Sequence, residues 1–121
     1  MENIVVWFDM PVKNLKRAAE FYRKVLGVEL QKMEQAPVPV AMFPFSPGVA
    51  SGCLVESKEI SPSKQGATVY LNGGKDLAGP LGKVEAAGGK VLQKKTAIGE
   101  HGFIAYFEDT EGNRVGLHSM N

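Results

Sequence analysis

Residues 14–27 read NLKRAAEFYRKVLG, and this segment is the strongest indication of how the chain folds. Asn14 is a residue type that caps helix N-termini, and Gly27 stands where a left-handed C-terminal cap belongs. The apolar positions recur at helical spacing on one face and are Leu15, Ala18, Ala19, Tyr22, Val25 and Leu26. The segment therefore predicts one helix with a defined start, a defined end and an apolar face.

The same pattern occurs a second time in the chain. Lys13-Asn14-Leu15 opens the first copy and Lys75-Asp76-Leu77 opens the second, 62 positions later, and Gly27 falls on Gly89 at that offset. Each copy reads as a strand, a helix, a glycine and several short strands. A duplicated βαβββ unit needs its partner to cover its apolar face, and the seam between two such sheets leaves a concave cleft. The repeat therefore predicts where a ligand would bind.

The strands are predicted from runs of β-branched and aromatic residues bounded by turn residues. Those of the first copy are Ile4–Met10, Val28–Lys32, Val38–Phe43 and Gly52–Glu56. Those of the second copy are Ala67–Asn72, Lys90–Thr96, Phe103–Glu108 and Arg114–His118. The fold class is therefore α+β, with two tandem βαβββ modules, about 1–57 and 66–121, in a single domain that forms a cleft between curved mixed sheets.

The connections between these strands follow from glycine, proline and capping residues. We expect Asp76 to cap a second helix that ends at Gly88-Gly89. The inner face of this helix is predicted at Leu77, Leu81, Val84 and Gly88. Residues 57–66 are predicted to form the linker between the copies, and residues 109–113 a hairpin loop.

Composition indicates an ordinary globular protein. Of 121 residues, 44% are hydrophobic and 22% are charged, and the net charge of +1 gives no reason to expect a polyelectrolyte partner. The basic residues of the first helix are broken by Glu20, which indicates a solvated helix face rather than a nucleic-acid patch. Cys53 is the single cysteine, and no signal peptide or membrane-spanning stretch is recognised. We expect a cytoplasmic protein with neither a nucleic-acid nor a membrane partner.

Three segments carry a resemblance to a known family: residues 14–22 with Val25-Leu26-Gly27, residues 84–89, and residues 107–113. They resemble the vicinal oxygen chelate superfamily, also called the glyoxalase / bleomycin resistance / dioxygenase group. The likeness covers essentially the whole chain and implies paired βαβββ modules and a homodimer. These segments are structural signatures, so they do not identify a reaction.

The resemblance also implies a four-ligand metal site, with one ligand from the first strand and one from the last strand of each half. Carried over by counting, the first-strand positions are Trp7 and Val69, and the last-strand positions are Leu54 and Gly116, with Cys53 replacing Leu54 if the register slips by one. A divalent metal needs three or four nitrogen, oxygen or sulfur ligands. We therefore expect that the family metal ligands are lost and that no metal or other cofactor is bound.

Polar residues near these positions leave an alternative open. Asp9, Glu56 and His118 lie two positions away on the same strand faces, because strand side chains alternate with period two. They could form a displaced carboxylate–imidazole metal site or simply a polar rim of the cleft. The full predicted lining of the cleft is Trp7, Asp9, Leu54, Glu56, Val69, Leu71, Ile104, Tyr106 and His118.

Structural roles are alternatives for several of these residues. Trp7 could fill the cleft as core, and Tyr106 could pack over Gly116. The five-residue hairpin loop predicts the facing pairs Glu108 with Arg114, Tyr106 with Gly116, and Ile104 with His118. The vacancy at Gly116 is then expected to leave space beside the Tyr106 ring, and the Glu108 and Arg114 side chains are expected to form an ion pair.

Three functions are compatible with this sequence. The first is a metal-free protein that binds a small aromatic or amphipathic molecule between its two sheets. The second is a metal-dependent lyase, isomerase or dioxygenase with a displaced metal site at Asp9, Glu56 or His118. The third is a metal-free acid–base enzyme that uses Asp9 or Glu108 with His118. We favour the first, with Trp7, Asp9, Leu54, Glu56, Val69, Tyr106 and His118 as the ligand-binding residues.

Overall fold

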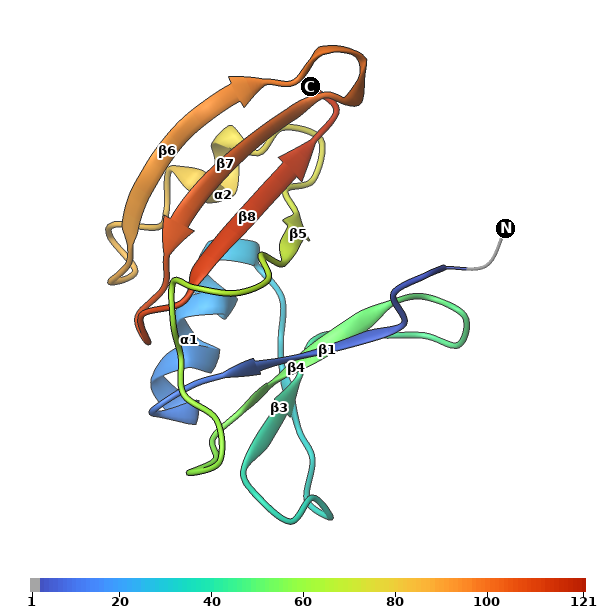
Figure 1. Cartoon of the computed structure of the whole chain (residues 1–121), viewed down its shortest axis with the longest axis vertical. Helices are drawn as coiled ribbons and strands as arrows, with labels where there is room; N and C mark the ends of the chain where they lie inside the picture. The colour runs from blue at the N-terminus through green and yellow to red at the C-terminus, as the bar shows by residue number, and fades with distance from the viewer. Residues whose placement is uncertain (1–2) are drawn as a thin grey trace.

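Two four-stranded mixed sheets, each built from one half of the chain, dominate the computed structural model, which describes residues 3–121 (Figure 1). Their strand orders are β1-β4-β3-β2 and β5-β8-β7-β6. The first sheet consists of β1 (Trp7–Pro11), β2 (Gln31–Lys32), β3 (Val40–Met42) and β4 (Ser51–Val55). The second consists of β5 (Tyr70–Asn72), β6 (Lys90–Ala97), β7 (Phe103–Glu108) and β8 (Arg114–Ser119). Strand β1 pairs with β4 and β5 pairs with β8 in parallel, and the other pairs are antiparallel. The predicted α+β class with two repeated modules is confirmed.

The first helix forms as the sequence predicts. Helix α1 (Leu15–Leu26) begins after Asn14, whose side-chain oxygen accepts a hydrogen bond from the Arg17 N–H at 2.9 Å. It ends at Gly27, whose φ of 70° lies in the left-handed region that glycine tolerates. The buried side chains of the helix are Ala18, Phe21, Tyr22 and Val25.

The second helix is much shorter than predicted. Helix α2 covers only Ala78–Leu81 and is followed by turns instead of continuing to Gly88. Glycines at positions 79 and 82 flank Pro80, and glycine is a poor helix former. The N-cap of α2 is Leu77 and not the predicted Asp76, although Asp76 Oδ1 accepts the Ala78 N–H at 2.9 Å in the turn that opens the helix. Leu77 and Val84 are fully buried as predicted, so the turns keep the inner face without the helix.

Four predicted strands are shortened, including β3 and β5, which cover only Val40–Met42 and Tyr70–Asn72, and the hairpin register is confirmed. Strand β1 begins at Trp7 instead of Ile4, and only Gln31–Lys32 of the predicted strand over residues 28–32 pairs with β3. Ile4 is 96% exposed, so nothing in the described chain covers the segment before β1. The three facing pairs predicted across the β7–β8 hairpin are all present: Glu108–Arg114, Tyr106–Gly116 and Ile104–His118.

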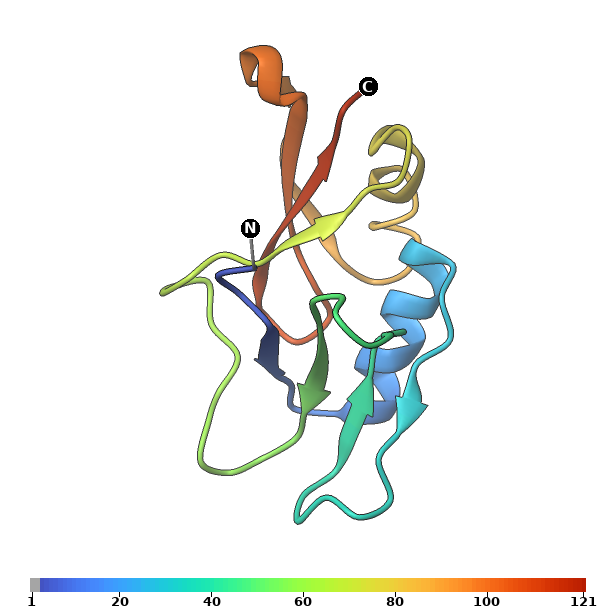
Figure 2. The ribbon, with the colours of Figure 1, turned by 90° about the vertical axis from the view of Figure 1, so that its right-hand side faces the viewer.

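One hydrophobic core joins the two halves around α1. Met10 and Leu54 of the first sheet and Phe107 and Leu117 of the second belong to one buried cluster with the inner face of α1. Figure 2 shows α1 and α2 on the same side of the molecule, so the opposite faces of the two sheets carry no helix. We call these the outer faces. Neither helix approaches the length and apolarity of a membrane span within residues 3–121.

A buried polar joint fixes the β7–β8 hairpin loop to the start of α1. Glu111 accepts hydrogen bonds from the N–H groups of Lys13 and Asn14, each at 2.9 Å, and from the Arg17 guanidinium. Asn113 donates from Nδ2 to the Pro11 carbonyl at 2.7 Å. The joint therefore ties the end of β1 and the beginning of α1 in the first module to the last hairpin of the second module.

Candidate functional site

The outer face of the second sheet carries an aromatic and cationic cluster. The Tyr70 ring lies over Gly116 on the neighbouring parallel strand, since a Cβ at position 116 would stand 2.5 Å from Tyr70 Cδ2. The Tyr70 and Tyr106 hydroxyls are hydrogen-bonded to each other, and their rings meet at 61° with centroids 5.7 Å apart. Tyr70 is 47% exposed, so one aromatic surface faces solvent.

Arg114 completes this cluster, which we call the Tyr70–Tyr106–Arg114 platform. Its guanidinium carbon lies 3.9 Å from the centroid of the Tyr106 ring, a cation–π arrangement. Its Nη1 donates a hydrogen bond to Thr68 Oγ1 at 2.7 Å. The predicted ion pair between Glu108 and Arg114 is wrong, because Glu108 Oε1 lies 3.3 Å from Lys64 Nζ. The Arg114 side chain is directed to Thr68 and Tyr106 instead.

The corresponding face of the first sheet holds Trp7, Asp9 and Cys53. Trp7 is 38% exposed and meets the Phe45 ring edge-on, with centroids 5.9 Å apart. Asp9 Oδ1 accepts a hydrogen bond from the Cys53 thiol at 3.2 Å. Burial, followed by the hydrogen bond to Asp9, raises the pKa of the Cys53 thiol to about 11. The thiol is therefore protonated at neutral pH and is neither a ready nucleophile nor a ready metal ligand.

Two predicted site residues lie on the opposite faces of their strands. Leu54 is fully buried and Val69 is partly buried against the same core, so both point toward the helices. Cys53 pairs with Asp9 and lies on the outer face with it. The structure therefore has the alternative register of the prediction, in which Cys53 replaces Leu54. For Val69 the physical cause is a local change in spacing: Leu77 lies six positions after the core residue Leu71, whereas Leu15 lies five positions after Met10. A shift of one residue turns each strand side chain to the other face.

Glu56 and His118 have local structural partners. Glu56 Oε1 accepts the Leu15 N–H at 2.7 Å, which places this carboxylate at the N-terminus of α1 and away from the outer face. His118 lies on the outer face beside Ile104, and its Nε2 is 2.7 Å from the carbonyl oxygen of His101. The carbonyl can only accept, so His118 Nε2 is the donor. This contact fixes the His118 ring against the loop before β7.

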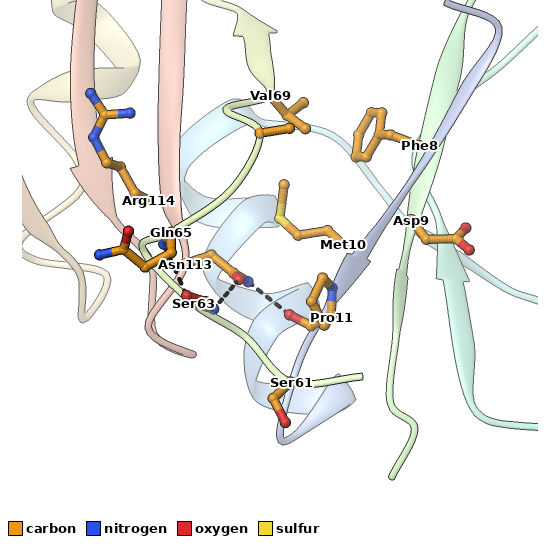
Figure 3. A pocket seen from close by; sticks show the side chains of 11 residues that line it. Phe8, Asp9, Met10, Pro11, Ser61, Ser63, Gln65, Val69, Asn113 and Arg114 are labelled. Carbon is orange, nitrogen blue, oxygen red and sulfur yellow. Dashed lines mark hydrogen bonds between the residues drawn. The ribbon is translucent and has the colours of Figure 1, made fainter. Parts of the chain in front are cut away.

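The predicted residues do not line one common cleft. Asp9 and Val69 border a pocket of about 270 Å³ between β1, the linker and the start of β8 (Figure 3). Figure 3 shows Phe8, Met10 and Val69 gathered on one side of β1 and the Asp9 carboxylate pointing away on the other. Tyr70 and His118 border a second pocket of about 470 Å³, and Glu56 a third of about 660 Å³. Trp7 and Tyr106 border none of these three.

The residues present do not fit the metal of the family. On the outer faces, the strand positions are occupied by Trp7, Cys53, Tyr70 and Gly116, of which only the protonated Cys53 thiol is a ligand type. Within residues 3–121, no three side chains of His, Cys, Asp or Glu type gather closely enough to hold a metal ion. The displaced set is also separated, because Asp9 and His118 border different pockets and Glu56 caps α1.

The acid–base pair of Glu108 and His118 is likewise not assembled. Glu108 faces Arg114, and His118 is four residues farther along β8. At about 3.3 Å per strand residue this is a separation of roughly 13 Å, too far for direct proton transfer.

Sequence reasoning missed Tyr70 and Arg114 as site residues. The available signal was Gly116, because a glycine within a strand often marks the close approach of another group.

Comparisons with known proteins agree with this architecture. Residues 4–117 match the family model described as the glyoxalase/bleomycin resistance protein/dioxygenase superfamily. A glyoxylase-like domain-containing protein from Didymella fabae is 33% identical over 116 residues, which cover 87% of this chain and 84% of that protein.

Solved structures share the fold. A mutant of glyoxalase I from Zea mays superposes with a TM-score of 0.74 at 25% identity over 94% of this chain, and this chain spans only 45% of that enzyme. TnmS3, an antibiotic-binding protein from Streptomyces sp. CB03234, superposes with a TM-score of 0.69 at 21% identity, covering 98% of this chain and 97% of that protein. The chain belongs to the glyoxalase/bleomycin resistance protein/dioxygenase superfamily.

Proposed function

We propose that this protein binds a small aromatic or amphipathic molecule on its outer face without the help of a metal ion. One observation carries the proposal: the Tyr70 ring covers Gly116, the position to which the family resemblance assigns a last-strand metal ligand. An aromatic surface therefore stands where a metal ligand would be required. Aromatic rings with a few polar groups are the usual lining of small-molecule sites.

The exposure of the platform supports binding over a purely structural role. Tyr70 is 47% exposed although it is a large aromatic residue, and its ring reaches from the edge strand β5 over β8. Its hydroxyl and the Arg114 guanidinium add polar groups at the edge of this surface. The antibiotic-binding protein from Streptomyces establishes only a shared fold at its level of identity, and this fold is compatible with holding a small molecule.

A homodimer in the cytoplasm is part of the proposal. Exposed apolar side chains precede and flank β1, with Ile4 96%, Val6 71% and Phe45 54% exposed. A second copy that covered this strip would remove an apolar surface from water. Light scattering at micromolar concentration tests this: a dimer is expected for the natural chain and a monomer for Val6→Asp. A natural chain that is monomeric at high concentration would contradict the dimer.

The binding proposal is tested by metal analysis and a ligand screen. Purified protein should contain far less than one equivalent of Zn, Ni, Mn or Fe. Aromatic compounds should change the fluorescence of the tyrosines or of Trp7, the single tryptophan. Tyr70→Ala should abolish this response, whereas Ile60→Ala, which trims a side chain of similar exposure from the linker, should not. A tight equimolar metal would favour the metal-dependent lyase, isomerase or dioxygenase instead.

A further inference from the structure

We infer that the Tyr70–Tyr106–Arg114 platform selects aromatic carboxylates, with Arg114 holding the carboxylate and Tyr70 the aromatic ring. This inference rests on the proposed function, because it names the ligand class of the same site. It begins from the charge of Arg114. No carboxylate within residues 3–121 lies within 4 Å of its guanidinium, and the nearest candidate by register, Glu108, is paired with Lys64. The platform therefore carries a positive charge that the described chain leaves uncompensated.

The guanidinium is fixed in place and keeps donors free. Stacking on Tyr106 and the hydrogen bond from Nη1 to Thr68 hold its plane, and no other side-chain hydrogen bond of Arg114 is present in the described chain. Every buried side-chain nitrogen or oxygen there has a hydrogen-bond partner. The unbonded nitrogens of Arg114 are therefore not buried. A planar guanidinium with free N–H groups is well suited to a bidentate carboxylate.

The tyrosine pair adds to this preference for an anion. The Tyr70 and Tyr106 hydroxyls bond to each other, so one donates its proton to the other, and the second proton stays available to a ligand. The bond to Tyr106 raises the pKa of Tyr70, so the Tyr70 hydroxyl keeps its proton at physiological pH. Donors from Arg114 and from one tyrosine thus converge on this end of the platform. A ligand with acceptor oxygens satisfies them, whereas an amine would meet a like charge.

The spacing of residues along β8 sets the distance between the ring contact at Tyr70 and the carboxylate contact at Arg114. Tyr70 lies over Gly116, which is two residues from Arg114 on β8, or roughly 6.6 Å at strand rise. An aromatic ring stacked on the exposed face of Tyr70 can therefore direct a carboxylate on the ring or on a short spacer toward Arg114. Aromatic acids of one or two fused rings fit this description.

The test uses three probes that share one ring system: 2-naphthoate, 2-naphthamide and 2-naphthylmethylamine. Calorimetric or fluorescence titration of the full chain should give an affinity for the naphthoate at least about tenfold higher than for the amide, the size expected of a charge-assisted bidentate contact. The amine should bind more weakly than the amide. Added NaCl should weaken only the naphthoate, because salt screens exposed charge pairs.

Variants assign the effect to Arg114. Arg114→Gln should reduce the affinity for the naphthoate to that for the amide and leave the amide unchanged. Lys16→Gln removes an exposed cation from α1 and should change neither the affinity for the naphthoate nor that for the amide. Equal affinities of acid and amide in the natural chain, or no salt dependence, would overturn the inference while the proposed function stands. If none of the three probes or any other aromatic compound binds, the proposed function itself fails. If Arg114→Gln does not fold, the comparison of the three probes in the natural chain still tests whether the platform selects carboxylates.

Discussion

The ring of Tyr70 occupies the space in which any side chain at position 116 would have to stand. A Cβ at Gly116 would lie 2.5 Å from Tyr70 Cδ2 and 2.7 Å from Cε2. The first sheet holds a similar pair on its core face, where a Cβ at Gly52 would lie 2.3 Å from Phe8 Cδ2. In both sheets a glycine lets an aromatic ring lie flat across two parallel strands, but only the Tyr70 ring is half exposed to solvent.

Alanine at these two glycines should therefore have different effects. In Gly116→Ala the Tyr70 ring can swing into solvent, so we expect a loss of only about 1 kcal/mol in the free energy of unfolding together with loss of ligand binding. In Gly52→Ala the Phe8 ring can move only by giving up its contacts with the core, so the loss should be larger, about 3 kcal/mol. Urea denaturation of both variants checks this order. Equal losses would show that the Tyr70 ring is not free to move.

Acid should weaken the joint between the hairpin loop and α1 through Glu111. Burial alone would raise the pKa of this carboxyl group, but hydrogen bonds from Arg17, Thr110 and two backbone N–H groups outweigh it and hold the pKa at about 2. Because the folded pKa is depressed below the usual value near 4.3, the stabilisation is fully present above that value and is lost as the pH falls toward 2. Its size is about 2 kcal/mol, since the half-exposed Arg17 is screened by water.

Glu111→Gln should remove this part of the acid sensitivity. Its unfolding free energy should be lower than that of the natural chain at pH 7, and the difference should shrink between pH 5 and pH 2. Glu20→Gln is the matched control, because Glu20 pairs with Arg23 on the exposed surface of α1 and should matter little. Urea denaturation across this pH range measures both. A difference that does not change with pH would contradict the assigned pKa.

Asn113 should be intolerant of a negative charge. Its Nδ2 donates to the Pro11 carbonyl at 2.7 Å and to Asp109 Oδ2 at 3.1 Å. Only 5% of the surface of the residue is exposed. Asn113→Asp replaces this donor by a carboxylate that faces two acceptors, which should cost about 3 kcal/mol at pH 7. Asn113→Ala should cost less, about 2 kcal/mol, because it adds no charge.

The control for this prediction is Asn72→Asp. Asn72 is exposed and only accepts a hydrogen bond, from the Gly74 N–H to Oδ1 at 2.8 Å, which an aspartate can also accept. Its unfolding free energy should stay close to that of the natural chain. If Asn113→Asp were as stable as Asn72→Asp, Asn113 would not be a donor at the joint.

Cys53 should react slowly with alkylating reagents in the folded protein. With a pKa of about 11, only about one thiol in a thousand is ionised at pH 8, against roughly a quarter for an ordinary cysteine of pKa 8.5. Iodoacetamide should therefore modify folded Cys53 at least about 100-fold more slowly than the urea-unfolded chain at the same pH. Mass spectrometry of quenched samples gives both rates. Asp9→Asn should increase the folded rate, because the carboxylate helps to raise the pKa; an unchanged rate would leave burial as the whole cause.

Local patterns determined the elements of this fold that depend on neighbouring residues. The caps at Asn14 and Gly27 and the register across the five-residue hairpin loop follow from spacing over a few residues, and the structure confirms them. The predicted inner face of α1 is buried at Ala18, Tyr22 and Val25, and it also includes Phe21, which the prediction left out. The length of α2 could not be predicted from these patterns. Leu77 and Val84 are buried in the observed series of turns, as they would be in a longer helix, so their spacing does not distinguish the two.

The amino-acid sequence alone is enough to predict the repeated architecture and the family, and it shows no ordinary metal-binding side chain at the counted positions. Which strand residues face outward depends on the folded chain, because Gly73 and Gly74 accommodate one extra residue before α2 and a single residue reverses every side chain of a strand. That reversal exchanges Val69 for Tyr70, and the pairing of β1 with β4 places Cys53, not Leu54, beside Asp9. It also brings Tyr70, Tyr106 and Arg114 together from three strands, a proximity that depends on pairing between residues distant in the chain.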